Sequence, residues 1–291
     1  MLTQRTAIPV ETRSPGHAVE LPSVPLAGTV VVWHARETCS NRQSEPASSK
    51  REARKDAKPQ RPASLGGLTA LRESLLLPDE LRHADRIRNE LARAEFVTAR
   101  ALLRVILGHC LGLEPRRVVL KKTATGKPYV PDWCNPQRLR FNVSHSHGEI
   151  LIAVARGFEV GVDLEPVRPL DNMDEVAAEF MTPDEAFLYD ISGEKKPETY
   201  FRVWTRKEAL LKATGLGLQL PLRLTESLSR RVTIVRPDSL ARPSPGEYSL
   251  RSFTTETGAL AAVSSCRNHF ELRHHEARVL DTNHHKTKQT S

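Results

Sequence analysis

A short strand-like stretch that carries two acids sets the strongest limit on how this chain can fold. Residues 160–165 read VGVDLE, an apolar, β-branched run that includes Asp163 and Glu165. Successive side chains of a strand point to opposite faces, so both acids lie on one face, with Val162 and Leu164 on the other. Two like charges this close repel and lose hydration unless a metal ion, a bound cation or a salt-bridge partner lies beside them. The alternative is a strand end that runs into solvent.

The charge and cysteine content narrow the class of protein. No apolar run approaches the eighteen or so residues that span a bilayer, and the N-terminus has no apolar signal segment, so we expect a soluble, cytoplasmic protein. The cysteines are scattered without a CxxC pair, which argues against a zinc cage or a disulfide framework. A net charge of +8 indicates an anionic partner. With only 5% aromatic residues, nucleic acid ranks behind a phosphorylated cofactor or an acidic protein.

The chain as a whole reads as an α+β protein in two halves that join near Phe158. Strands are predicted at 28–36, 117–121, 139–143, 149–156, 159–165, 231–235, 248–253 and 259–265, and helices at 86–111, 174–180, from 183 onward and 198–214. We expect a flexible leader at 1–26, an N-terminal lobe at 27–157 with a linker or disordered insertion at 39–67, a C-terminal lobe at 158–268 and a flexible tail at 269–291.

Two further stretches carry chemistry. In WTRKEALLK, residues 204–212, Trp204, Glu208 and Lys212 share one helix face, although an amphipathic helix with an ordinary Glu-Lys pair explains the same pattern. In FNVSHSH, a strand ends in hydroxyls, an imidazole and loop amides, which suits a phosphate. Its His-x-His pair could also bind zinc, but Cys134 has no partner at the right spacing, so this interpretation is weaker.

Together these stretches resemble the Sfp-type 4'-phosphopantetheinyl transferases. That family combines a (V/I)-G-(V/I)-D-x-E strand with a W-x-x-K-E-x-x-x-K helix further along, preceded by G-K-P and F-N-x-S-H-S. This sequence has GKP at 126–128, FNVSHS at 141–146, GVDLE at 161–165 and WTRKEALLK at 204–212. The resemblance covers about residues 70–265 and leaves out the leader, the insertion and the end of the chain.

The resemblance implies a pseudo-twofold α+β fold in which two similar lobes, each a small, mostly antiparallel sheet with packed helices, meet at a coenzyme A (CoA) site. Such enzymes move the phosphopantetheine arm of CoA onto a serine of an apo acyl, peptidyl or aryl carrier protein and release adenosine 3',5'-bisphosphate. Asp163, Glu165 and Glu208 would then hold Mg²⁺, with Mn²⁺ as an alternative ion, and this cation would account for the acids in the strand.

The resemblance also assigns roles to the remaining motif residues. Glu208 is the expected general base, directly or through a metal-bound water. Lys212, which would also bind CoA, and Lys207 would offset charge on the leaving phosphate, and Trp204 would position the helix by packing.

The expected CoA-binding residues lie mainly in the N-terminal lobe. His145 would contact a CoA phosphate, with Ser144 and Lys127 in the same pocket. Arg82 and Arg86 are expected near the 3'-phosphate.

The expected partners are CoA and an acidic apo carrier protein, and a positively charged rim around the site would steer both toward it. The resemblance also implies that the protein is a monomer. Phe180, Met181 and Phe187 would form either an apolar contact for the carrier or part of the core. Two alternatives remain at this point. One is a metal-dependent phosphodiesterase or nuclease, and the other is a basic nucleic-acid-associated protein, suggested by the charge run at 50–58.

Overall fold

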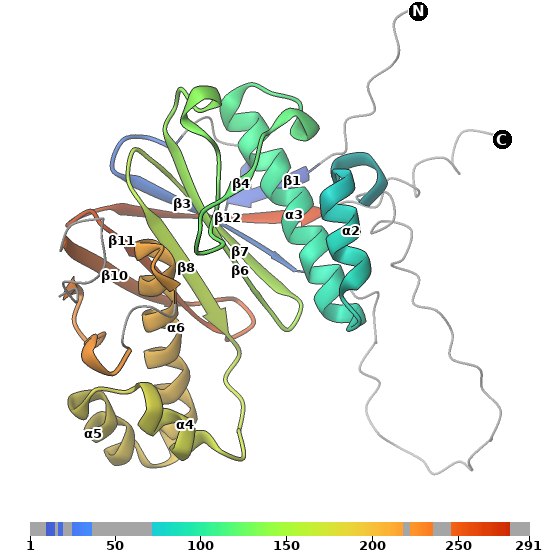
Figure 1. The fold of residues 1–291 in the computed structure, drawn as a ribbon. Helices are drawn as coiled ribbons and strands as arrows, with labels where there is room; N and C mark the ends of the chain where they lie inside the picture. The colour runs from blue at the N-terminus through green and yellow to red at the C-terminus, as the bar shows by residue number, and fades with distance from the viewer. Residues whose placement is uncertain are drawn as a thin grey trace, which may run out of the picture.

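The computed structural model of this chain describes residues 10–14, 17–19, 25–36, 72–217, 222–234 and 246–279. The insertion expected at 39–67 lies outside these residues, as do parts of the leader and of the tail. The described residues form two main sheets, with helices packed on their outer faces, and a separate pair of short strands (Figure 1).

The larger sheet combines both ends of the chain. Its strands are β1 (Val10–Ser14), β2 (His17–Val19), β3 (Thr29–Arg36), β6 (Leu139–Ser146), β7 (Glu149–Arg156) and β12 (Glu271–Val279), in the order β2-β1-β12-β3-β7-β6. Neighbouring strands run antiparallel except β12 and β3, which are parallel. The predicted strands at 28–36, 139–143 and 149–156 are confirmed, within a residue or a few at their ends.

Helices α2 (Pro78–Arg86) and α3 (Glu90–Leu111) accompany this sheet, and α3 packs along one of its faces. The Asn89 side chain accepts a hydrogen bond from the Ala92 amide at the start of α3, and Gly112 ends the helix with a φ of 66°. A left-handed residue at this position satisfies the last carbonyls, so the expected stop at Gly112 is confirmed.

The smaller sheet follows in the second half of the chain. It has the order β8-β11-β10-β9, formed by β8 (Val160–Glu165), β9 (Arg231–Ile234), β10 (Gly246–Thr254) and β11 (Leu260–Ser265). Helices α4 (Met173–Phe180), α5 (Pro183–Ile191) and α6 (Lys196–Thr214) lie between β8 and β9 in sequence. The expected capping box at Thr182 is present, because the Thr182 and Glu185 side chains each bind the other residue's amide.

One predicted strand is largely wrong. Of residues 117–121, only Lys121 belongs to a strand, in the small pair β4 (Lys121–Lys122) and β5 (Pro128–Tyr129). A 3₁₀ turn, η1 (Pro115–Arg117), precedes it, and Arg104 donates hydrogen bonds to the carbonyls of Pro115 and Val118. Further 3₁₀ turns are η2 (Asp132–Cys134), η3 (Gly193–Lys195) and η5 (Leu222–Leu224).

Alternation along the strands produces a four-layer arrangement. Val31 and Trp33 of β3 face α3, whereas Val30 and Val32 face the second sheet. In that second sheet Val162 packs into the same inter-sheet core, so the opposite face of β8 looks toward α6. The layers are therefore helix, sheet, sheet, helix, which confirms the α+β class and the opposite facing of apolar and acidic side chains in VGVDLE.

The two halves share an order of connection. In each half, one strand pairs with the last strand of a hairpin, and a long helix lies between them in sequence. These strands are β3 with β7 and β6 around α3, and β8 with β11 and β10 around α6. This repeated order is what a duplicated lobe would show, and the pseudo-twofold relation itself stays a prediction.

The ends of the chain require a correction. Strands β1 and β2 lie within the expected flexible leader at 1–26, and β12 lies within the expected flexible tail at 269–291. Strand β12 therefore joins the larger sheet, between β1 and β3. Its sequence, ELRHHEARV, hid this role because two of its buried positions are His275 and Ala277, so no apolar period is visible.

Among the helices that the structure describes, none combines the length and the apolar character needed to cross a membrane.

Candidate active site

A cavity of about 330 Å³ opens where the end of β6 meets β8 and α6. We call it the carboxylate cavity, and its lining residues are Val143, Ser144, His145, Asp163, Glu165, Trp204, Glu208 and Lys212. Three stretches that the sequence analysis singled out are thus brought together from distant parts of the chain.

The close contact between α6 and β8 depends on Gly161. A Cβ atom at this position would lie 2.0 Å from the Ala209 carbonyl oxygen and 2.3 Å from the Ala213 amide nitrogen. Only glycine allows the helix backbone to approach the strand this closely. As a result, Glu208 and Lys212, on adjacent turns of α6, lie beside Asp163 on β8.

Asp163 is the most buried acid of the cavity, with 5% of the residue exposed. Its Oδ1 accepts hydrogen bonds from Lys212 Nζ at 2.6 Å and Ser144 Oγ at 2.7 Å. Its Oδ2 is also buried but has no hydrogen-bond partner. Burial raises the pKa of Asp163, while Lys212 and Ser144 act in the opposite direction. A salt-bridge partner, one of the options open from the sequence, therefore accompanies this acid.

Glu165 and Glu208 complete the acidic side of the cavity. Glu165 Oε2 accepts hydrogen bonds from Ser146 Oγ and from an Arg168 guanidinium NH group, each at 2.9 Å. Burial raises the pKa of Glu208, Lys212 opposes this shift, and the charges of Asp163 and Glu165 add to it. The three carboxylates are thus close enough to influence one another. The partners of Glu165 were not predicted.

Lys207 does not belong to the cavity, which corrects the expected catalytic role. Its side chain is fully buried, and Nζ forms an ion pair with Glu185 Oε2 at 2.7 Å. The same ammonium donates hydrogen bonds to the carbonyls of Phe180, Leu222 and Thr225 at 2.6–2.9 Å. With its donors directed to the end of α4, to Glu185 of α5 and to the segment at η5, Lys207 serves to attach α6 to its neighbours.

His145 is held at the rim by an acid that sequence reasoning missed. Its Nδ1 lies 3.0 Å from Glu95 Oε2, and Glu95 Oε1 accepts a hydrogen bond from the Gly148 amide. Glu95 lies on α3, fifty positions away in sequence. No local pattern marks it, because a single acid in a helix is ordinarily a surface residue.

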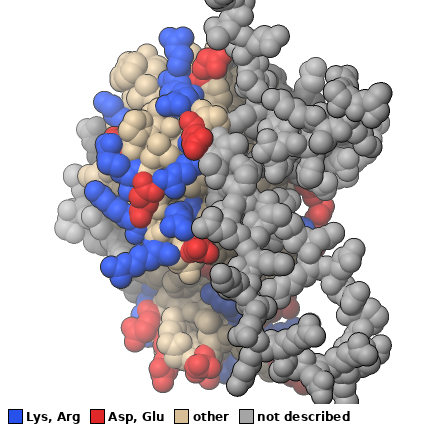
Figure 2. All heavy atoms as spheres, turned by 90° about the vertical axis from the view of Figure 1, so that its right-hand side faces the viewer, with Lys and Arg blue, Asp and Glu red and all other residues tan. Residues whose placement is uncertain are grey.

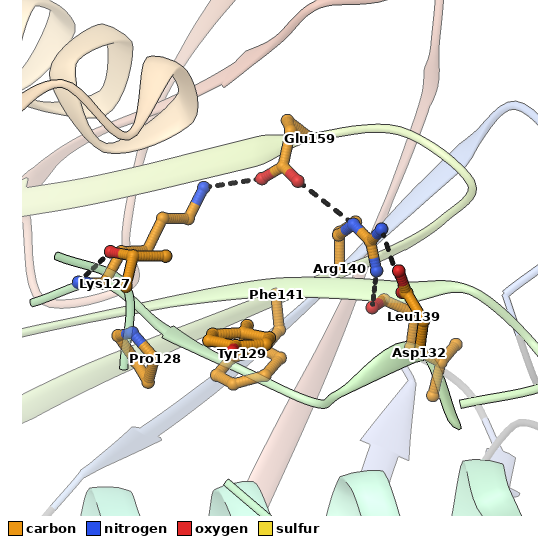
Figure 3. A pocket seen from close by; sticks show the side chains of 9 residues that line it. Lys127, Pro128, Tyr129, Asp132, Leu139, Arg140, Phe141 and Glu159 are labelled. Atoms are coloured by element: carbon orange, nitrogen blue, oxygen red, sulfur yellow. Dashed lines mark hydrogen bonds and ion pairs between the residues drawn. The ribbon is translucent and has the colours of Figure 1, made fainter. Parts of the chain in front are cut away.

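Lys127 lies beside the carboxylate cavity rather than in it. It lines a cavity of about 290 Å³, the loop cavity, together with Thr125, Gly126, Pro128, Asn142, Glu208, Leu211, Lys212, Gly215 and Gly217. It also lines a cavity of about 260 Å³, the Tyr129 cavity, with Thr123, Pro128, Tyr129, Asp132, Leu139, Arg140, Phe141 and Glu159 (Figure 3). Shared lining residues place the three cavities in a row along β6.

Arg82 and Arg86 line none of these cavities. Both lie on α2 and are exposed, and Arg82 forms an ion pair with Asp79 one turn earlier. The face of the molecule that carries α2 shows basic side chains with acids between them (Figure 2). The expected contact of these two residues with a 3'-phosphate is therefore not supported by their position.

Among the described residues, no group of three or more His, Cys, Asp and Glu side chains is arranged closely enough to hold a metal ion as it stands. In this arrangement Lys212 supplies the positive charge beside Asp163.

Comparisons with known proteins agree on one family. Residues 159–263 match a model described as the 4'-phosphopantetheinyl transferase superfamily, and residues 70–157 match one described as 4'-phosphopantetheinyl transferase, N-terminal. The 4'-phosphopantetheinyl transferase HetI of a Nostoc species is 36% identical over 190 residues, 65% of this chain and 78% of the relative.

Two further relatives match shorter stretches. A putative 4'-phosphopantetheinyl transferase of a Synechocystis species is 33% identical over 50% of this chain and 59% of its own length. The 4'-phosphopantetheinyl transferase of Bacillus subtilis is 29% identical over 42% of this chain and 52% of its own length. The chain thus spans little more than half of these two relatives.

Proposed function

Because this chain belongs to the 4'-phosphopantetheinyl transferase superfamily, we propose that it moves the phosphopantetheine arm of CoA onto a serine of an apo carrier protein with the help of Mg²⁺. The observation that carries the proposal is the carboxylate cavity, in which Asp163, Glu165, Glu208 and Lys212 meet. The row of cavities along β6 supports it further, because CoA is a long ligand with charged and apolar parts.

The carboxylates of the cavity have the ligand chemistry that a divalent cation needs, although they would have to move closer together to hold it. Asp163 Oδ2 is a buried carboxylate oxygen without a partner, and an oxygen of this kind is costly unless a cation or donor binds it. Asp163, Glu165 and Glu208 would hold Mg²⁺, which prefers oxygen ligands and retains several waters. When bound, the ion supplies charge stabilisation for the phosphoryl oxygens.

The side chains around this position suit the transfer step. The serine Oγ of the carrier attacks the β-phosphorus of CoA, the bond to the α-phosphate oxygen breaks, and adenosine 3',5'-bisphosphate leaves. Glu208 takes the serine proton through a carboxylate oxygen that the cation leaves free. Lys212 offsets charge on the leaving phosphate: two of its bonds go to Asp163 and Ser144, and an ammonium has three donors.

Residues at the edge of the site and on α5 are in position to contact CoA and the carrier protein. His145 lies at the rim of the carboxylate cavity, where it would contact a CoA phosphate. Of the three candidates for a carrier contact, Phe180 and Met181 are buried in the core, whereas Phe187 is 67% exposed on α5. We propose that Phe187 contributes to carrier binding, and that the partner is an acidic carrier domain recognised by a monomer of this chain.

The experiment that tests the proposal is intact mass spectrometry of purified apo carrier protein incubated with this protein, CoA and Mg²⁺. A carrier mass gain of about 340 Da, the phosphopantetheine arm, is expected, and a chelator should abolish it. Asp163→Asn and Glu208→Gln should abolish it as well, with thermal melting showing that both variants are folded.

Two outcomes would contradict the proposal. Absence of any gain on acyl, peptidyl and aryl carriers, with CoA bound to the folded protein, would mean that the acceptor and base are wrongly assigned. Hydrolysis of CoA without a carrier would instead indicate the phosphodiesterase alternative.

A further inference from the structure

Lys127 is not free to bind a phosphate in this structure. Its Nζ lies 2.8 Å from Glu159 Oε2 and 3.3 Å from the Val160 carbonyl oxygen, and its side chain is 13% exposed. Glu159 lies just before β8, outside every motif of the sequence analysis. An ammonium paired with a carboxylate must release it, or share it, before it can bind the phosphate of a ligand.

Glu159 has a second cation on its other oxygen. Arg140 Nε lies 3.0 Å from Glu159 Oε1, and Arg140 is itself within 3.4 Å of Asp132 Oδ1. Figure 3 shows Glu159 between Lys127 and Arg140, with the rings of Tyr129 and Phe141 below them in that view. If Lys127 turned away, the charge of Glu159 would still be paired with Arg140, so losing the lysine would cost the carboxylate little free energy.

A Lys127 side chain that turned away from Glu159 could reach a ligand in either of two cavities. Lys127 lines both the Tyr129 cavity and the loop cavity, and the loop cavity also contains Glu208 and Lys212. The side chain of Glu159 is 41% exposed, and an ion pair at such a site is weak and readily exchanged. A phosphate carries more charge than one carboxylate and can take the place of Glu159 as the partner of Lys127.

We propose that Glu159 is a displaceable counter-ion that holds Lys127 at the junction of the two cavities and gives it up to a phosphate of CoA. This inference rests on the proposed function. Arg140 keeps Glu159 in place during the exchange, so the carboxylate competes with CoA for one lysine. Glu159 is a positioning residue that tunes the affinity for CoA, and it does not take part in the bond-making step.

Calorimetry of CoA binding to the full chain, without carrier protein, tests this inference. Glu159→Gln leaves a weaker acceptor near Lys127, so the Kd for CoA should fall by roughly 1.5- to 5-fold, the range expected for one exposed ion pair. In a Lys127→Met background the same change should have no effect, because the lysine that exchanges partners is gone. The gain should also shrink at high salt.

A matched control removes one negative charge elsewhere. Glu194 is exposed in η3 and lines none of the three cavities, so Glu194→Gln should leave the Kd unchanged. In carrier assays, the KM for CoA should fall in Glu159→Gln while the KM for the carrier stays the same, a split that a general change in folding would not produce.

Several outcomes would overturn the inference. A weaker affinity in Glu159→Gln would mean that Glu159 orients Lys127 rather than competes for it. An equal gain in the Lys127→Met background would mean that Glu159 acts only by long-range repulsion. If the unaltered protein does not bind CoA, the proposed function fails and this inference falls with it, whereas binding that is unchanged in Glu159→Gln removes this inference alone.

Discussion

At the scale of single residues, two lysines of one helix occupy opposite environments. Lys207 is enclosed with Glu185 and three carbonyls, while Lys212 reaches Asp163 at the cavity and its side chain is 27% exposed. Both belong to the motif that suggested a common catalytic role. Their different surroundings predict different consequences when each charge is removed.

Lys207→Met should destabilise the fold by about 3–5 kcal/mol, because Glu185 would remain buried without its cation. Lys212→Met leaves Asp163 without its cation too, but at a partly exposed site, so we expect a smaller loss of stability and a loss of carrier modification by about 100-fold or more. Chemical denaturation and the mass assay measure the two effects. If Lys207→Met kept its stability and lost only activity, the catalytic role expected from the resemblance would be restored.

His275 predicts a pH effect on stability. It stacks on Trp33 with 5.8 Å between the ring centroids, and its Nδ1 is buried without a partner. Burial, with a smaller contribution from Arg273, lowers its pKa below the usual 6.5. The unfolded chain therefore binds this proton more tightly, so the stabilising contribution is complete above pH 6.5 and is lost as the pH falls below it.

Replacing this ring by one that cannot titrate should flatten that response. His275→Phe keeps a ring against Trp33, and its unfolding free energy should fall less between pH 7 and pH 5 than that of the unaltered protein. Denaturant unfolding at several pH values gives the comparison. Parallel pH curves for the two proteins would assign the acid sensitivity to other groups.

At the scale of elements, the contact between β8 and α6 decides whether the cavity forms. Helix α6 carries Trp204, Glu208 and Lys212, and its distance from the strand is set by the missing side chain of Gly161. The expected helix boundaries, caps and facing of side chains were largely correct for these two elements. Their separation could not be predicted from periodicity, which says nothing about how close two elements lie.

Gly161→Ala should displace α6 from β8, because its Cβ would meet backbone atoms that cannot move by themselves. We expect a loss of stability of about 2 kcal/mol and a fall in transfer rate of about 100-fold, since small displacements of reacting groups are costly. Gly258→Ala is the comparison, because a Cβ there meets nothing within 4 Å and only its φ of +90° is unfavourable. Equal activity losses in both variants would contradict the role of the close contact.

At the scale of the whole molecule, the larger sheet depends on β12, the strand that comes last among the described residues. Strand β12 lies between β1 and β3, in register from Glu271 beside Thr29 to Ala277 beside Ala35. This sheet therefore cannot close until β12 has been made, although its other strands all lie before residue 157.

A chain that ends after residue 270 should lose its cooperative melting transition and aggregate, because β1 and β3 would be left with unpaired edges. A chain that ends after Val279 retains β12 and should melt as a cooperative unit. Differential scanning calorimetry of both proteins measures the contrast. If the shorter chain melted like the longer one, the sheet would not need β12, as a flexible tail would imply.

The sequence by itself determined the parts that depend on local periodicity. The opposite facing of Asp163 and Val162, the shared helix face of Glu208 and Lys212, and the capping of α5 all follow from the geometry of single elements. The order of the motifs also led to the correct family.

Only the tertiary structure decided which partner each side chain meets. Adjacent residues of a helix point about 100° apart, so Glu208 reaches the cavity while Lys207 turns to Glu185. The pairing of Lys127 with Glu159 likewise joins residues that are distant in sequence and carry no shared pattern. A periodic pattern specifies the face of an element, but the element that covers this face is chosen by the packing of the whole chain.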